Sequence, residues 1–318
     1  MKKINFSVTG ANGYIGSKLV NELKKNNNII NAFASNVKVY EEENINGCLF
    51  DIKDKNCWEE IILKSDVIFH LAGNTSLYFA KENKLENYDL TIKPIHDIIS
   101  ICQKYNKKPL IIFSSTATVY GLQNIFPVSE LVLPKPMTIY DEHKLLAEKM
   151  LVDARNNKIL NCCNVRLSNV YGPSNMKASS RDRGIINKVC IDAIKGKKVN
   201  IFGDGEYIRD YVYIDDVIDA LIKIALSKND IKDTYNICSG DGTSLVNAFN
   251  LIILKVKEII NKDCDIIYEN WPNNAEVIEK RNFIGDNTRL KNDVNWQPKV
   301  QLEVGIEKMI NFFNEEKS

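Results

Sequence analysis

A tyrosine and a lysine four positions apart are the first residues in this sequence whose spacing suggests chemistry. Tyr140 and Lys144 lie near the start of residues 139–155, where apolar residues recur at helical spacing. One helical turn places both side chains on the same face, about 6 Å apart along the axis. A phenol is a poor base near neutral pH, and a neighbouring ammonium favours its ionised form. The pair therefore predicts general acid/base catalysis, with Tyr140 moving the proton and Lys144 promoting its ionisation.

A run of hydroxyl side chains strengthens this interpretation, because Y-x-x-x-K alone often occurs by chance. Ser114, Ser115 and Thr116 stand at the end of an apolar run over residues 110–115, ahead of the Tyr–Lys pair. The apolar run predicts a strand, and the carboxyl ends of parallel strands border the ligand crevice of open α/β sheets. The hydroxyls are therefore expected beside the same crevice.

A glycine-rich segment close to the amino terminus predicts a phosphate-binding turn. Residues 9–16 read T-G-A-N-G-Y-I-G and lie between an apolar run at 4–9 and a helical pattern at 17–25. Glycines let the backbone approach a pyrophosphate, and the amino terminus of the following helix supplies N–H groups and positive dipole. A strand–turn–helix context is the one in which this motif binds a dinucleotide.

The end of the second expected strand favours one dinucleotide over the other. An acidic residue about 20 positions after the glycines ordinarily holds the adenosine ribose hydroxyls. This chain instead has Ser35, Asn36 and Lys38 there, which suit a 2′-phosphate that a carboxylate would repel. We therefore expect NADP(H) to be preferred, with NAD(H) as the alternative if this loop is displaced.

The elements that must position these residues alternate between strand and helix. Strand patterns occupy residues 4–9, 29–33, 47–50, 67–72, 110–115 and 163–167, and helical patterns occupy 17–25, 57–64, 85–105 and 139–155. This alternation predicts an α/β fold, a doubly wound parallel sheet of the Rossmann type. After residue 168 the pattern loosens, with helical stretches at 185–195, 217–226, 246–260 and 304–314. We expect a dinucleotide-binding domain over 1–168 and a smaller, mainly substrate-binding domain over 169–318, with some elements returning to the first.

Composition excludes several classes of function. The 318 residues carry 42 Lys+Arg against 41 Asp+Glu, so no fold-wide basic field exists for nucleic acid or an anionic membrane. No apolar run approaches the ~20 residues that span a bilayer, and no signal-peptide pattern follows Met1. The eight cysteines include no C-x-x-C pair, so we expect buried reduced thiols, no metal site and a cytoplasmic protein.

Taken together, these motifs resemble an extended short-chain dehydrogenase/reductase of the nucleotide-sugar epimerase/dehydratase family. The resemblance covers nearly the whole chain. Its motifs are residues 10–16, Asp51-Ile52, 70–73 (H-L-A-G), 114–121, Tyr140 with Lys144, 166–173 (R-L-S-N-V-Y-G-P), 202–205 (F-G-D-G), 209–217 and 296–298 (W-Q-P). One departure is T-I-K-P at 91–94, where relatives often carry N-V-x-G.

The resemblance implies roles for individual residues. Thr116 would contact the sugar hydroxyl at the reacting carbon, Tyr140 would be the general acid/base, and Lys144 would bind the nicotinamide ribose. The implied cofactor contacts are Gly10, Asn12, Gly13, Tyr14, Ile15, Gly16, Ser35, Asn36, Lys38, Asp51, Ile52, Leu71, Ala72, Gly73, Ser114, Tyr140, Lys144 and Leu167. The implied substrate contacts are Thr116, Asn169, Arg209 and Arg281. Arg209 could alternatively form a salt bridge with Asp210, Asp215 or Asp216.

The resemblance leaves more than one reaction open. Ala117 and Thr118 replace the Asp–Glu acid pair of 4,6-dehydratases, which disfavours dehydration. We expect an oxidoreductase that reduces the C4 keto group of a nucleotide-linked 4-keto-6-deoxy sugar, as the loop at Ser35 favours. The alternative is an NAD-dependent 4-epimerase of the UDP-glucose 4-epimerase kind, as the S-S-T-A-T-V-Y-G segment favours. A regulator that senses the cofactor without chemistry ranks below both, because Tyr140 and Lys144 are present.

The resemblance also implies a partner. Relatives pair through the two helices expected at residues 85–105 and 139–155, which form a four-helix interface. Both segments carry apolar residues beyond one core-facing stripe, among them Leu146 and Met150. We therefore expect a homodimer that acts on a nucleotide-diphosphate sugar.

Overall fold

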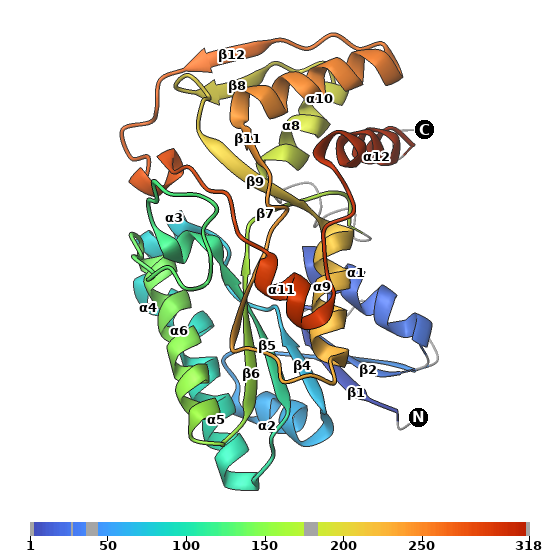
Figure 1. Ribbon diagram of the computed structural model, residues 1–318. Helices are drawn as coiled ribbons and strands as arrows, with labels where there is room; N and C mark the ends of the chain where they lie inside the picture. Colours follow the sequence, from blue (N-terminus) through green and yellow to red (C-terminus); the bar gives the residue numbers. More distant parts are fainter. Residues whose placement is uncertain (1–2, 27, 36–43, 175–183, 316–318) are drawn as a thin grey trace. The chain divides into compact units, whose positions relative to one another are not determined.

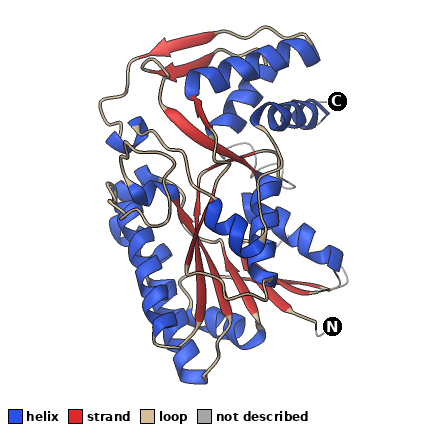
Figure 2. Ribbon diagram, in the orientation of Figure 1, coloured by secondary structure: helices blue, strands red, loops and turns tan. Residues whose placement is uncertain are grey.

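A computed structural model describes residues 3–26, 28–35, 44–174 and 184–315 (Figures 1 and 2). The chain divides into two compact units. Unit 1 comprises Met1–Gly121, Leu133–Arg166 and Leu221–Tyr235, and unit 2 comprises Leu122–Val132, Leu167–Ala220 and Asn236–Ser318. Among the described elements, β6 (Asn161–Leu167), α9 (Ile214–Leu226) and β10 (Thr234–Ile237) have residues in both units.

A seven-stranded parallel sheet confirms the predicted doubly wound fold. Its strand order is β10-β6-β5-β4-β1-β2-β3. The remaining strands are β1 (Asn5–Thr9), β2 (Ile29–Ala34), β3 (Ile45–Leu49), β4 (Val67–His70), β5 (Leu110–Thr116) and β6 (Asn161–Leu167). Because the chain runs from β1 to β3 in one direction and from β4 outward in the other, the order reverses between β1 and β4. Open α/β sheets bind ligands outside the carboxyl ends of the strands at such a reversal.

Helices of unit 1 cover both faces of this sheet (Figure 1). They are α1 (Tyr14–Leu23), η1 (Lys24–Asn26), α2 (Lys55–Lys64), α3 (Leu77–Glu82), α4 (Lys84–Thr91), α5 (Lys93–Tyr105), η2 (Ala117–Tyr120) and α6 (Ile139–Asn156). Figure 1 shows α1 on one face and α2, α5 and α6 on the other. A buried apolar cluster that includes Trp58, Ile98, Phe113 and Leu151 fills the second face, so these helices are fixed against the strands that carry the site.

The segment 85–105 was predicted as one helix, and this prediction was wrong. The structure has two helices, α4 and α5, which meet at Ile92. Pro94 lies in the first turn of α5. Proline has no N–H to donate and clashes with a preceding helical turn, so it starts a helix well but cannot continue one.

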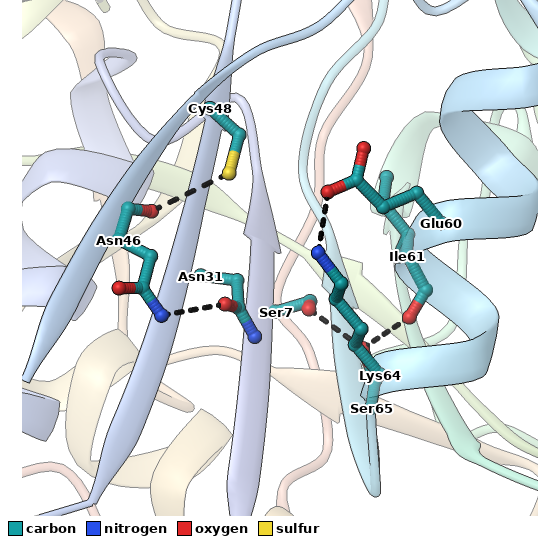
Figure 3. A network of polar contacts seen from close by, with 8 residues as sticks. All are labelled: Ser7, Asn31, Asn46, Cys48, Glu60, Ile61, Lys64 and Ser65. Atoms are coloured by element: carbon teal, nitrogen blue, oxygen red, sulfur yellow. Dashed lines mark hydrogen bonds and ion pairs between the residues drawn. The ribbon is translucent and has the colours of Figure 1, made fainter.

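Polar side chains occupy one register row of the sheet (Figure 3). Ser7 pairs with Asn31, and Asn31 pairs with Asn46, across β1, β2 and β3. Asn46 Nδ2 donates to Asn31 Oδ1 over 3.1 Å, and Ser7 Oγ lies 2.6 Å from Ser65 Oγ. Ser65 Oγ also donates to the Ile61 carbonyl of α2 over 2.5 Å. These groups satisfy one another, so this row needs no ligand to explain it.

Unit 2 is built from two small sheets and a group of helices. Its sheets have the orders β11-β9-β7 and β12-β8. Its elements are β7 (Asn169–Tyr171), α8 (Ile185–Ile194), β8 (Val199–Phe202), β9 (Ile208–Tyr213), β11 (Gly242–Ser244), α10 (Leu245–Ile260), β12 (Ile266–Glu269), η3 (Val277–Lys280), α11 (Thr288–Val294) and α12 (Leu302–Glu315). Helices α8, α10 and α12 pack against one another. Apolar residues such as Val189, Ile252 and Met309 are buried in this unit.

The cysteines are only partly as expected. All eight are free thiols, and five are buried. Cys48, Cys57 and Cys264 are partly exposed, so the expectation of burial was wrong for them. Cys48 lies on β3, which is the edge strand of the sheet among the described residues. Within the described residues, no helix is long and apolar enough to cross a membrane.

Candidate active site

The glycine-rich turn after β1 is closed so tightly that side chains cannot enter it. Gly10 has a φ of +72°, and a Cβ there would lie 3.0 Å from the Ala72 nitrogen. A Cβ on Gly16 would lie 2.1 Å from the Gly10 carbonyl oxygen. Gly13 N donates to that same oxygen over 2.8 Å. The turn therefore requires glycine at Gly10 for its conformation and at Gly16 for space.

The turn leads directly into the amino terminus of α1. Gly13 is the N-cap residue, and it has no side chain that could accept from the first helical N–H groups. The first turn of α1, all of it described, contains no acidic residue. This helix end therefore keeps its positive dipole and suits an anion such as a pyrophosphate. A dinucleotide fits the residues present.

The loop after β4 lies against the glycine turn. Ala72 N donates to Thr9 Oγ1 over 3.2 Å, and Thr9 Oγ1 lies 2.9 Å from His70 Nδ1. His70 is fully buried, and desolvation lowers its pKa to about 3, which keeps the imidazole neutral. Its ring packs edge-on against Trp58. The structure thus brings residues 10–16 together with 71–73, two of the groups of cofactor contacts that the resemblance implies.

The expected contacts to the adenosine end are less fully described. Ser35 is exposed and directly follows β2, whereas Asn36 and Lys38 lie outside the described residues. After β3, the Asp51 carboxylate accepts from Lys53 N over 2.9 Å, and the Ile52 carbonyl accepts from Trp58 Nε1 over 2.9 Å. Asp51 is exposed, so its carboxylate can meet a ligand.

The tyrosine and lysine occupy the first turns of α6, as predicted. Lys144 Nζ lies 6.0 Å from the centre of the Tyr140 ring and donates to the Ser114 carbonyl over 2.8 Å. Ser114 Oγ donates to the His70 carbonyl over 3.1 Å, which ties the ends of β4 and β5 together. Lys144 is only 5 % exposed. Desolvation lowers its pKa to about 8, although the nearby Glu148 carboxylate acts in the opposite direction.

A pH-dependent stability is expected from Lys144. Its pKa of about 8 in the folded protein lies below the ordinary 10.5, so the folded state loses this proton first as the pH rises. Folding is then penalised by the buried ammonium below pH 8, and the penalty disappears between pH 8 and 10.5. We expect the free energy of unfolding of the wild type to gain about 3 kcal/mol relative to Lys144→Met across that window. Denaturant titrations of both proteins measure this, and parallel pH profiles would contradict it.

A buried ion pair that the sequence analysis missed lies further along the same helix. The Arg166 guanidinium donates to both oxygens of Glu148, with Nη2 at 2.6 Å from Oε2, and Ser115 Oγ donates to Oε1. The guanidinium carbon lies 4.8 Å from the centre of the Tyr120 ring. Glu148 follows Lys144 by four residues, so its place on the same helix face as the expected catalytic lysine was the signal available in the sequence. The pair fixes α6 against β5 and β6.

Unit 2 contains three of the four expected substrate residues, Asn169, Arg209 and Arg281, and they lie close to Asp210. Asn169 Nδ2 donates to the Asp210 carbonyl over 3.2 Å, and Arg281 Nη2 lies 3.5 Å from Asn169 Oδ1. The buried Asp210 carboxylate accepts from Ser239 N at 2.7 Å and from Gly285 N at 3.2 Å. Burial raises the pKa of Asp210, and these hydrogen bonds oppose that rise. Sequence reasoning had considered Asp210 only as a partner for Arg209.

Arg209 makes backbone contacts instead of the salt bridge considered as its alternative role. Its guanidinium donates to the carbonyls of Glu279 at 2.5 Å, Ile208 at 3.1 Å and Arg281. Burial lowers its pKa from the usual value for arginine. Arg209 therefore holds the segment that carries Arg281, while the expected diphosphate contact stays a prediction. Leu167, an expected cofactor contact, is the last residue of β6 and belongs to unit 2.

The sheet order, the glycine turn after β1 and the Tyr–Lys pair on α6 define a short-chain dehydrogenase/reductase of the extended type. The chain belongs to the NAD dependent epimerase/dehydratase family, whose model matches residues 6–238. It is 28 % identical over 319 residues to a UDP-glucose 4-epimerase of Mycolicibacterium smegmatis, covering 96 % of this chain and 97 % of the relative.

Solved structures agree with this assignment. The crystal structure of a Thermotoga maritima UDP-glucose 4-epimerase with UDP-glucose superposes with a TM-score of 0.87 at 28 % identity, covering 99 % of this chain and 100 % of that one. A Bacillus cereus UDP-glucuronic acid 4-epimerase in complex with UDP-glucuronic acid and NAD has a TM-score of 0.85 at 22 % identity, covering 98 % and 100 %. At that lower identity the likeness concerns the fold.

Proposed function

We propose that this protein is a UDP-sugar 4-epimerase that works with bound NAD. The observation that carries the proposal is the strand-end segment Thr116-Ala117-Thr118 beside Tyr140 and Lys144, in a chain similar to UDP-glucose 4-epimerases over its whole length. Ala117 cannot act as the acid that a dehydratase needs at this place. The 4-keto reduction first expected from the sequence has less support than this alternative.

Support for NAD over NADP(H) comes from the structural neighbours, because the Bacillus cereus UDP-glucuronic acid 4-epimerase structure contains NAD. Ser35 offers a neutral hydroxyl after β2, and Asn36 and Lys38 lie outside the described residues. The family description itself names NAD. The preference for NADP(H) expected from Ser35, Asn36 and Lys38 therefore has less support than NAD.

Tyr140 and Lys144 divide the proton chemistry between them. When held at the glycine turn, NAD would supply a reversible hydride acceptor for C4 of the sugar, and no cofactor would be consumed because the hydride would return to the opposite face. Tyr140, as phenolate, accepts the C4 hydroxyl proton as that hydride leaves, and gives it back when the hydride returns. Lys144 stands near the Tyr140 ring and favours its ionised form. Thr116 contacts the reacting hydroxyl.

The cofactor that stays with the purified protein tests this proposal. An epimerase regenerates its nicotinamide within each cycle, so the protein is expected to purify with NAD, released on denaturation and identified by chromatography. A reductase would instead purify largely empty and consume NADPH stoichiometrically with a nucleotide-linked 4-keto-6-deoxy sugar. NADP(H) as the bound nucleotide would overturn the proposal.

We also propose that the protein is a homodimer. Helices α4 and α6 pack together, and each leaves apolar side chains in solvent: Leu85 is 84 % exposed and Leu146 44 %. Exposed apolar side chains on two helices that pack together are typical of a subunit interface. We expect sedimentation equilibrium at micromolar concentration to give twice the chain mass. A monomer at that concentration would contradict the proposal, and Leu85→Glu with Leu146→Glu should produce one.

A further inference from the structure

A buried carboxylate lies beside the expected catalytic residues. Asp141 directly follows Tyr140 on α6 and is 1 % exposed. Its Oδ2 accepts from Thr138 Oγ1 over 2.8 Å, and its Oδ1 accepts from Thr118 Oγ1. Thr118 Oγ1 lies 2.9 Å from Thr116 Oγ1. A chain of hydrogen bonds thus joins the Asp141 carboxylate to the threonine that faces the sugar in the proposed reaction.

The chemistry of these groups sets the direction of the chain. An ionised carboxylate only accepts hydrogen bonds, so the Thr118 hydroxyl must give its single proton to Asp141. In the contact between the two threonines, Thr118 can then only accept, and Thr116 must be the donor. The Thr118 backbone N–H also donates to Thr116 Oγ1 over 3.2 Å. Thr116 therefore has its proton committed within the protein and keeps a lone pair for a ligand.

We propose that Asp141 is a positioning residue that, acting through Thr118, makes Thr116 a hydrogen-bond acceptor toward the sugar. This inference rests on the proposed function and specifies the substrate of the same site. Thr116 and the Tyr140 phenolate then present two acceptors to the single proton of a C4 hydroxyl. A ketone, or any other group without a proton, could not donate to the Thr116 oxygen and would face its lone pair. The site selects an alcohol at C4 as its ground-state ligand, which is what an epimerase binds.

The test is a binding measurement with two probes that differ in one donor. UDP-glucose can donate from C4, and UDP-4-deoxy-4-fluoroglucose has a fluorine of similar size that cannot. Calorimetry is performed on NAD-loaded protein carrying Tyr140→Phe, which prevents turnover and removes the second acceptor. We expect UDP-glucose to bind about tenfold more tightly than the fluoro analogue, the usual worth of one good hydrogen bond.

Four further variants in that background separate positioning from a merely structural role. Thr118→Val frees the Thr116 proton, so the preference should fall to about twofold or less, and Thr118→Ser should restore it. Asp141→Leu removes both carboxylate oxygens at similar volume, so the Thr118 hydroxyl loses its acceptor and the preference should fall likewise. Thr138→Val is the matched control, because it removes the other hydroxyl on the same carboxylate. It should lower thermal stability and keep the preference.

The outcomes distinguish this inference from the proposed function. A preference that is unchanged in Thr118→Val, or lost equally in Thr138→Val, would overturn the role of Asp141 even if the wild type is an active epimerase. A protein that binds neither probe would overturn the proposed function and this inference with it.

Discussion

Replacing Tyr140 with phenylalanine should lower epimerase turnover by about 10²–10⁴-fold, the usual contribution of a positioned acid/base. The phenyl ring keeps the packing of the first turn of α6, and only the hydroxyl that carries the proton is lost. Affinity for NAD and for the UDP-sugar should therefore change little. Steady-state kinetics together with calorimetry separate these two effects.

The control for this variant is a second tyrosine on a neighbouring helix. Tyr88 lies on α4, is 45 % exposed and packs edge-on against His143 of α6. Tyr88→Phe removes a hydroxyl from the same unit without touching the proton path, so its turnover should stay within about twofold of wild type. If Tyr140→Phe kept more than a tenth of the activity, Tyr140 would not be the acid/base.

Substituting Gly16 with alanine should abolish tight binding of the dinucleotide. The added Cβ would stand 2.1 Å from the Gly10 carbonyl oxygen, so the turn must open to admit it. Gly13 N donates to this same oxygen, and Gly10 itself lies against the loop after β4. Opening the turn would therefore displace both the turn and that loop. Strain of about 1–3 kcal/mol corresponds to a loss of cofactor affinity of roughly 10- to 100-fold.

Asn21→Ala is the matched control for Gly16→Ala, because Asn21 lies on α1 beyond the turn and alanine is a good helix former there. Its cofactor affinity should equal that of the wild type. Fluorescence titration with NAD measures both variants. Unchanged affinity in Gly16→Ala would mean that the cofactor does not depend on this turn.

The strands and helices of unit 1 could be predicted because their signals are local. A strand, a glycine turn and a helix follow one another within residues 4–25, and Tyr140 and Lys144 share a face through helical periodicity alone. The break at Ile92 was missed although Pro94 was visible in the sequence, because the apolar period continues across both helices. The proline was stronger evidence for a helix boundary than the apolar periodicity was for one continuous helix.

The surroundings of the site could not be predicted in the same way. Thr118 and Asp141 are 23 residues apart, and Glu148 and Arg166 are 18 apart. Their contacts depend on how α6 lies against β5 and β6, which no local pattern specifies. The same holds in unit 2, where Arg209 reaches carbonyl groups 70 and 72 residues further along the chain. A short spacing reveals a catalytic pair, but the residues that hold it come from distant segments.

The most direct test of the central claim is the conversion of UDP-galactose by the purified protein with no cofactor added. If the protein is a 4-epimerase with resident NAD, the anomeric proton signals of UDP-glucose should appear and approach the same equilibrium mixture from either sugar. The nicotinamide absorbance should show no net change during the reaction. The account would be contradicted if protein that contains NAD formed no UDP-glucose from UDP-galactose and instead oxidised NADPH stoichiometrically with a 4-keto sugar nucleotide.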